Sequence, residues 1–179
     1  MNKIKTALQI LFLSILISSC TNTHDKLAQE ISAKEKILFK DKDVKMNTKT
    51  AREIISQYRY FAEKFPDDSM AAEYLYKAGD VSSGINAYTN ALEFFSAITQ
   101  KYPQSSKAAY SLFLQGYINE NNLHDTAKAK QFYNDFITKY PAHEMAESAK
   151  FSLLNLGKTP EQIIAEFSKA DSLASAENK

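Results

Sequence analysis

The sequence has little cysteine, glycine or proline, and each shortage excludes a class of protein. Its 179 residues include one cysteine, four glycines and four prolines. A single cysteine rules out an intramolecular disulfide framework and a cysteine-based zinc site. The four glycines stand at positions 79, 84, 116 and 157, too far apart for a phosphate-binding loop or the nucleophile elbow of a serine hydrolase.

A marked excess of charge of one sign is also lacking. The chain carries 22 lysines and arginines against 21 aspartates and glutamates, for a formal charge of +1. This balance gives no overall electrostatic reason to expect a nucleic acid or an acidic substrate as partner. The apolar content of 44% is typical of a globular chain rather than a disordered one.

The N-terminal apolar stretch is too short to cross a membrane as a helix. It runs from Ala7 to Ile17, whereas a spanning helix needs roughly 20 apolar residues. Lys3 and Lys5 precede it and small residues follow it. A charged start, a short apolar run and small residues before a boundary are typical of a secretory signal.

The run from Ile17 to Cys20 resembles the bacterial lipobox, in which the cysteine is lipidated and becomes the first residue of the mature protein. The resemblance implies that residues 1–19 are a lipoprotein signal peptide, that Cys20 is the lipidation site and that residues 20–26 are a lipidated tether. Thr21, in place of aspartate, resembles outer-membrane sorting. We therefore expect a lipid-anchored protein of the bacterial cell envelope, at the outer membrane facing the periplasm. The alternative is an ordinary buried thiol beside a plain signal.

Three of the prolines mark an internal repeat. Pro66, Pro103 and Pro141 lie 37 and 38 residues apart, and a lysine and then an aromatic residue precede each. Apolar residues recur at helical spacing before each proline, and an alanine and an aromatic residue recur after it. Each proline ends the helix that precedes it, and Asp68 and Ser105 are placed to cap the helix that follows.

This pattern predicts an all-α chain of eight helices paired into four hairpins. The expected helices span residues 27–39, 49–65, 69–82, 85–101, 106–120, 126–140, 144–156 and 160–172. Residues 27–48 would form an N-terminal helix and a charged linker, and residues 49–157 the repeats. The first helix has only a thin apolar stripe, so a mobile tether is an alternative for it.

Residues 158–179 are expected to form a capping helix with a polar tail. Gly157 suits the left-handed end of the preceding helix, and Thr159 to Gln162 reads as a capping box. Ile163 and Phe167 would lie on the apolar side of the helix. Its polar side would then shield the end of the stack, as terminal caps do in repeat proteins.

The repeat resembles the tetratricopeptide repeat (TPR). From Ala91 to Pro103, and again from Ala129 to Pro141, the alanine, aromatic, apolar and proline positions follow the second helix of that motif and its closing proline. The resemblance covers about residues 50 to 156. It implies a TPR-like helical-hairpin solenoid with a C-terminal capping helix.

This repeated proline spacing, combined with a lipobox, resembles the outer-membrane lipoprotein family that contains the β-barrel assembly factor BamD. It also resembles the repeat domain of the Tol-Pal protein YbgF (CpoB). The chain has fewer repeats than the first and lacks the N-terminal coiled coil of the second. The resemblance implies a noncatalytic scaffold in outer-membrane protein assembly or, alternatively, a division coordinator linked to Tol-Pal and peptidoglycan. Large sugar-binding lipoproteins resemble the chain only locally. The implied partners are envelope proteins or peptide segments, including β-barrel assembly components, and the membrane through the lipid, but no nucleic acid.

No residue pattern indicates catalysis, a metal or a cofactor. His24, His124 and His143 lack the i, i+4 spacing of a helical metal pair. Asp41 and Asp43 begin like a calcium loop, but the later ligand positions are wrong. We therefore expect neither enzymatic activity nor a bound cofactor.

Recognition by the first helix of each hairpin is what remains, since those helices line the concave groove of TPR proteins. The candidate groove residues are Glu73, Tyr76, Asp80, Tyr110, Phe113, Tyr117, Glu120, Phe151 and Asn155. Their aromatics and acids could bind an aromatic-rich or basic peptide. The ladder Tyr76, Phe113 and Phe151 could instead be core, which is the favoured of the two interpretations. The aromatics assigned to the core are Tyr58, Phe61, Phe95, Tyr133 and Phe136.

Overall fold

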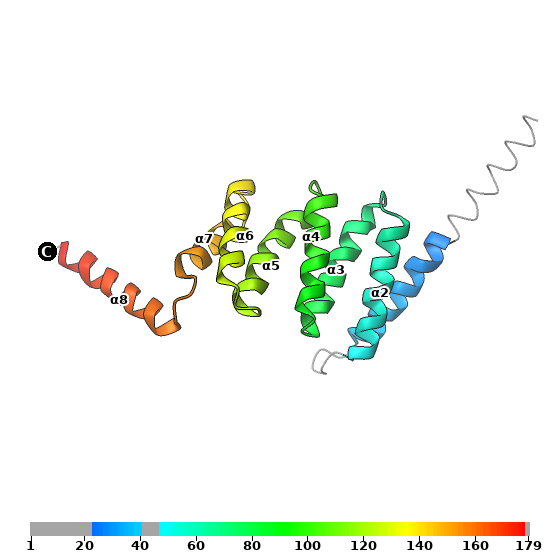
Figure 1. Cartoon of the computed structure of the whole chain (residues 1–179), viewed down its shortest axis with the longest axis horizontal. Coiled ribbons are helices and arrows are strands. Elements are labelled where there is room, and N and C mark those ends of the chain that lie inside the picture. Colours follow the sequence, from blue (N-terminus) through cyan, green and yellow to red (C-terminus); the bar gives the residue numbers. More distant parts are fainter. Residues whose placement is uncertain (1–22, 41–46, 178–179) are drawn as a thin grey trace, which may run out of the picture. The chain divides into compact units, whose positions relative to one another are not determined.

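The computed structural model describes residues 23–40 and 47–177. The predicted signal peptide and Cys20 lie outside these residues, as do Asp41 and Asp43. The described chain is helical and contains no strand, which confirms the predicted all-α class of helical hairpins (Figure 1). A helix over residues 23–38 is followed by α2 (Thr48–Lys64), α3 (Ser69–Gly84), α4 (Tyr88–Lys101), α5 (Lys107–Asn121), α6 (Thr126–Lys139), α7 (Ala146–Asn155) and α8 (Pro160–Glu177).

The helices form two compact units. The first ends at Lys107 and contains the helix of residues 23–38 with α2, α3 and α4. The second begins at Ala108 and contains the rest of α5 with α6, α7 and α8. Each unit has its own apolar core, and the predicted core aromatics are all confirmed as buried. Their exposed fractions are at most 1% for Tyr58, Phe61, Phe95, Tyr133 and Phe136.

Several helix boundaries differ from the predicted ones. The first helix, predicted from residue 27, is already formed at the first described residue, 23. The fourth begins at Tyr88 instead of residue 85, because Asn86 adopts a left-handed conformation with φ 60° that a helix cannot contain. His124, with φ 55°, turns the chain in the same way between α5 and α6. The last helix continues to Glu177, past the predicted end at 172.

The predicted capping groups make the expected hydrogen bonds. The Asp68 carboxylate accepts one from the Met70 amide at 2.7 Å, and the Ser105 hydroxyl accepts one from the Lys107 amide at 3.2 Å. The capping box before α8 is reciprocal. The Gln162 amide donates to the Thr159 hydroxyl at 3.3 Å, and the Thr159 amide donates to the Gln162 side chain at 2.9 Å. Gly157, at φ 80°, takes the left-handed conformation predicted for it.

In each of the two middle hairpins, α3–α4 and α5–α6, an aromatic ring of the second helix packs on a glycine of the first. A Cβ atom at Gly79 would lie 2.5 Å from the Phe95 ring, and one at Gly116 would lie 2.8 Å from the Tyr133 ring. Only a residue without a side chain allows α3 and α4, or α5 and α6, to approach this closely. Leu154 stands where the last hairpin would carry the equivalent glycine, and it is 72% exposed.

The helix of residues 23–38 is docked on the first unit. Leu27 and Ile31 are buried, and the Glu35 carboxylate accepts hydrogen bonds from the Tyr58 hydroxyl and from Lys77, both at 2.8 Å. Burial, together with the bond to Glu35, raises the pKa of the Tyr58 phenol. Of the two interpretations offered for this segment, the described contacts support the helix rather than a mobile tether.

His24 attaches the first turn of this helix to the turn between α2 and α3. Its Nε2 lies 2.9 Å from the Asp68 carboxylate and its Nδ1 lies 3.0 Å from that of Asp25. Its ring also contacts those of Phe61 and Phe65, with centroids 5.2 and 5.0 Å away. Both ring nitrogens face carboxylates, so the doubly protonated imidazolium satisfies both contacts.

The last hairpin is much less closed. α8 follows α7 as the predicted terminal helix, and Phe167 stacks on Phe151 with ring centroids 6.4 Å apart. Yet Phe151 is 50% exposed, Phe167 56% and Ile164 65%. Over residues 160–169, the apolar side chains of α8 thus remain largely exposed.

Candidate functional site

The groove residues predicted on α3 lie close together in the first unit, but they surround a lysine. The Lys107 ammonium lies 3.1 Å from the Glu73 carboxylate and 4.8 Å from the centre of the Tyr76 ring. Partial burial raises the pKa of the nearby Asp80 carboxyl; Lys107 acts against this rise and Glu73 adds to it. This part of the predicted surface therefore already contains its own cation.

The predicted groove residues of the second unit are also partly engaged within the chain. The Tyr110 hydroxyl donates to Glu144, and its ring meets the edge of His143 at 4.8 Å. The Glu120 carboxylate accepts a hydrogen bond from the Tyr133 hydroxyl at 2.6 Å. Tyr117 is the more accessible member, at 47% exposed.

The members of the aromatic ladder, Tyr76, Phe113 and Phe151, differ in whether they belong to the core or to the surface. Phe113 is only 8% exposed and packs against Tyr133 and Phe136 with centroids 5.7 Å apart, so it belongs to the core. Tyr76 is half-buried, and its ring packs 5.7 Å from that of Phe95. Phe151 is exposed.

Asn155, the last of the predicted groove residues, is buried. Its side-chain amide donates to the backbone carbonyl of Phe151 at 2.9 Å. An amide engaged inside its own helix is poorly placed to contact a partner.

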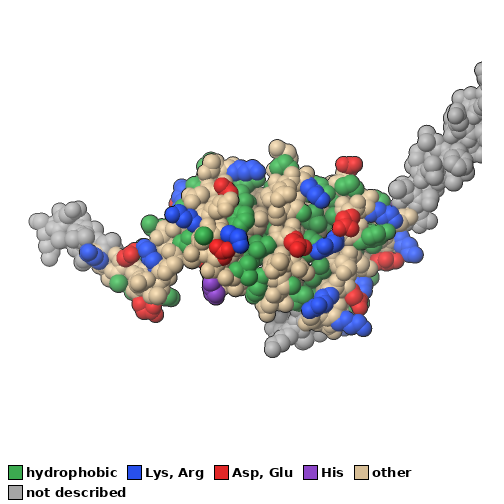
Figure 2. Space-filling model, in the orientation of Figure 1, with side chains coloured by type: hydrophobic (Ala, Val, Ile, Leu, Met, Phe, Trp, Pro, Cys, Tyr) green, Lys and Arg blue, Asp and Glu red, His purple; other side chains and the backbone are tan. Residues whose placement is uncertain are grey.

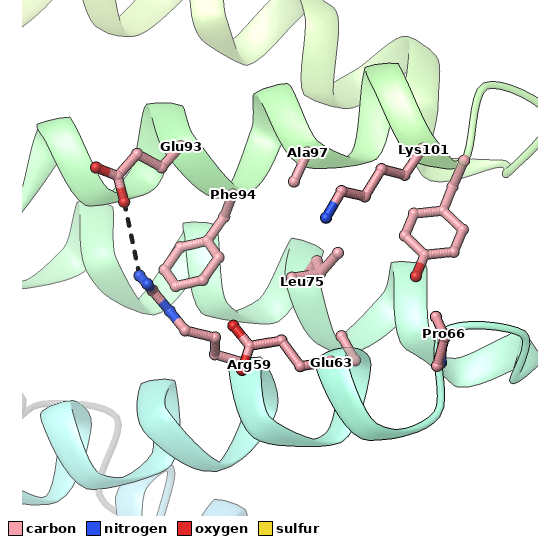
Figure 3. Close-up of a pocket in the computed structure, with 10 residues that line it drawn as sticks. Arg59, Glu63, Pro66, Leu75, Glu93, Phe94, Ala97 and Lys101 are labelled. Carbon is pink, nitrogen blue, oxygen red and sulfur yellow. Dashed lines mark ion pairs between the residues drawn. The ribbon is translucent and has the colours of Figure 1, made fainter.

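The first unit has a hollow on another face, between α2 and α4, that the sequence did not predict. Its volume is about 310 Å³, and its apolar lining comes from Ala62 of α2, Leu75 of α3, and Phe94 and Ala97 of α4 (Figure 3). Pro66 lines it where α2 ends. Ala62 and Ala97 both line the hollow, and their small side chains leave space that larger ones would fill.

An ion pair stands at the other end of the hollow. Arg59 of α2 lies 3.6 Å from the Glu93 carboxylate of α4, and its guanidinium sits 4.7 Å above the centre of the Phe94 ring (Figure 3). The pair bridges the two helices. A second hollow of about 530 Å³, which Ile55 and Ile85 line, lies next to the same arginine. Arg59 and Glu63 line both.

Glu63 and Lys101 flank the hollow from opposite helices. In Figure 3 the Lys101 side chain extends from α4 toward the space above Leu75, whereas the Glu63 side chain lies along α2 and is directed toward Arg59. Both are exposed, and within the described parts of the chain neither has an ion-pair or hydrogen-bond partner. An apolar hollow between an unpaired acid and an unpaired base suits a partner that supplies all three complements.

Little in the described residues suggests chemistry beyond binding. Across residues 23–40 and 47–177, no group of three histidine, cysteine or acidic side chains could hold a metal ion. No helix within those same ranges is long and apolar enough to cross a bilayer. Figure 2 shows basic and acidic side chains interspersed over the visible face. His143 accepts a hydrogen bond from the Met145 amide at 3.2 Å, a local structural contact.

Comparison with known protein families assigns part of the chain. Residues 73–105 and 110–143 match the family model described as tetratricopeptide repeat. The first match takes in most of α3 and all of α4, and the second most of α5 and all of α6. Comparisons with curated proteins and with solved structures found no match.

Proposed function

We propose that this chain, in which residues 73–105 and 110–143 match the tetratricopeptide repeat, is a noncatalytic scaffold, lipid-anchored in the bacterial cell envelope, that binds a protein partner near the membrane. Tetratricopeptide repeats stack into surfaces that bind protein or peptide segments. The observation that carries the proposal is the hollow between α2 and α4, which is lined by apolar side chains and flanked by the unpaired Glu63 and Lys101.

The envelope address rests on the lipobox-like run that ends at Cys20. The described helix begins at residue 23, so a lipid on Cys20 would keep the helix start within about 11 Å of the membrane, at ~3.6 Å per residue. His24 contacts Asp68 at the turn after α2, and Pro66 in the same turn lines the hollow. A lipid anchor would therefore hold the hollow at the membrane-proximal end of the first unit.

A scaffold held this close to a bilayer suits the handling of membrane-protein precursors or of neighbouring envelope complexes. We favour outer-membrane protein assembly, the task of the BamD-like lipoproteins that the sequence resembles. Work as a Tol-Pal or peptidoglycan-linked coordinator would require longer reach.

The anchor is tested by labelled fatty acid in cells that express the full chain. We expect label in the wild-type protein and none in Cys20→Ala, which should also leave the membrane fraction. Wild-type protein without label would contradict the anchor.

The partner is tested by a photo-crosslinking amino acid at Ala97, in the hollow, with mass spectrometry of the products. Lys130 on the exposed side of α6 is the control position. We expect the Ala97 position to capture β-barrel assembly proteins or their unfolded clients. Capture of Tol components or cell-wall synthases instead would overturn the assembly role in favour of the coordinator.

A further inference from the structure

We propose that the hollow between α2 and α4 recognises a partner segment in which one bulky apolar side chain stands between an acidic and a basic residue. This inference rests on the proposed function, because it specifies the partner of the same surface. It differs from the sequence-based expectation, which assigned recognition to the first helices and to an aromatic-rich or basic peptide.

The size of the hollow sets the central residue. A volume of about 310 Å³ is enough for one large aliphatic or aromatic side chain and too small for a whole helix. Leu75 and Phe94, which line it, are 7% and 3% exposed, so the walls are already packed and do not need to form on binding. The Arg59–Glu93 pair bridges the helices at one end, which confines the entering side chain.

Charge complementarity sets the flanking residues. Glu93 is paired with Arg59, whereas Glu63 and Lys101 lie on opposite sides with no partner among the described residues. A basic residue beside Glu63 and an acidic residue beside Lys101 would satisfy both charges. A segment with two charges of the same sign would meet repulsion on one side.

The α3 surface, where the sequence placed the groove, lacks these features. Its acid Glu73 is neutralised by Lys107, and the same lysine covers the Tyr76 ring. A partner docking there would have to displace an existing ion pair before making its own contacts. The α2–α4 hollow requires no such exchange.

The test uses the full chain lacking only its signal peptide and four capped peptides. The central probe is Gly-Ser-Lys-Ala-Phe-Ala-Glu-Ser-Gly, together with its version in which Lys and Glu change places. Alanine in place of Phe probes the apolar contact, and versions with two Lys or two Glu probe the charges. NMR titration gives both the Kd and the location of the perturbed resonances.

We expect the better of the two mixed-charge Phe peptides to perturb Leu75 and Ala97, and its Ala version to bind about tenfold more weakly or worse. Glu63→Lys should shift preference toward the two-Glu peptide and Lys101→Glu toward the two-Lys peptide, each by roughly two- to fivefold at low salt. Lys130→Glu and Asp135→Lys, the same reversals on α6, should leave the preference unchanged.

Filling the hollow gives an independent result. Ala97→Leu should abolish the advantage of Phe over Ala in the peptide, provided that its circular dichroism and melting match the wild type. The exposed charge variants keep the test decisive if that variant folds poorly. Perturbations centred on Tyr76, or peptide preferences that ignore both charge reversals, would overturn the inference. Crosslinking in cells reports separately on the scaffold role, so either proposal can fail while the other stands.

Discussion

The two end hairpins of the described chain differ sharply in how they are held. At the N-terminal end, Leu27 and Ile31 are buried and Glu35 joins Tyr58 and Lys77. At the C-terminal end, α7 and α8 share one exposed ring stack and leave Leu154 72% exposed. The same repeat thus yields a tightly packed hairpin where long-range contacts supplement the helical pattern, and a loose one where they do not.

The two middle hairpins are held in another way, by a ring packed on a glycine. In the middle hairpins it lets the second helix lie directly on the first, at Gly79 and at Gly116. In the last hairpin Leu154 occupies that position, and Phe167 of α8 stacks on Phe151 instead. Four predictions test this comparison, from the largest expected effect to the smallest.

Removal of a fully buried ring should cost most. Tyr133→Ala is expected to lower the free energy of unfolding by about 3–5 kcal/mol, because the cavity cannot be refilled. The matched truncation Phe167→Ala should cost about 1 kcal/mol at most, since that ring is more than half exposed. Urea unfolding followed by circular dichroism measures both. Equal losses would refute the difference between the hairpins.

Addition of a methyl group under a ring should come next. Gly116→Ala places a Cβ 2.8 Å from Tyr133 and should cost about 1–3 kcal/mol, despite the better helix propensity of alanine. Leu154→Ala should change stability by no more than about 0.5 kcal/mol because the side chain is exposed. The same unfolding measurement applies. A harmless Gly116→Ala would mean that the ring can move away.

Loss of a helix cap should be felt locally at the loose end. Thr159→Ala removes the acceptor for the Gln162 amide and should cost about 1 kcal/mol, mostly as lost helicity in α8. Asn47, which caps α2 through the Lys49 and Thr50 amides, is the control. Asn47→Ala should lower the stability of the first unit while α2 stays helical. NMR chemical shifts of each helix distinguish the outcomes, and uniform fraying in both variants would contradict the comparison.

The smallest effect should be a pH dependence at the first turn. Hydrogen bonds to Asp25 and Asp68 raise the pKa of His24 above 6.5. A raised pKa in the folded state means that the contribution to stability is full below pH 6.5 and is lost as pH rises through the folded value. The ratio of amide-exchange protection at residues 23–31 between wild type and His24→Gln should therefore fall toward one as pH rises. A ratio that stays constant would exclude the histidine contact.

Much of the fold was predictable because its determinants are local. The proline spacing, the caps at Asp68 and Ser105 and the helical period of the core aromatics each depend on neighbours in sequence. The helical turn over residues 23–26 depends instead on contacts between His24 and the distant Phe61 and Asp68. The start of α4 was placed too early because an apolar pattern does not reveal the left-handed turn at Asn86.

The binding surface was less predictable than the fold. Which aromatic of the ladder is core depends on how completely the next helix covers it, so Phe113 and Phe151 differ although the pattern treats them alike. The hollow is lined by Ala62 and Ala97, which are 35 positions apart in the sequence and on different helices. No periodicity in one helix reveals a space between two helices.

The loose terminal hairpin also limits how the gene can lengthen. A duplicated hairpin inserted next to α3–α4 or α5–α6 would bring its own glycine and its own ring, and its neighbour would also have the ring-on-glycine contact. A unit appended after α8 would rest on a hairpin in which Leu154 stands at the glycine position and no ring can pack on it in the same way. Tandem growth at the C-terminus would therefore first require a glycine at position 154 and an aromatic residue facing it.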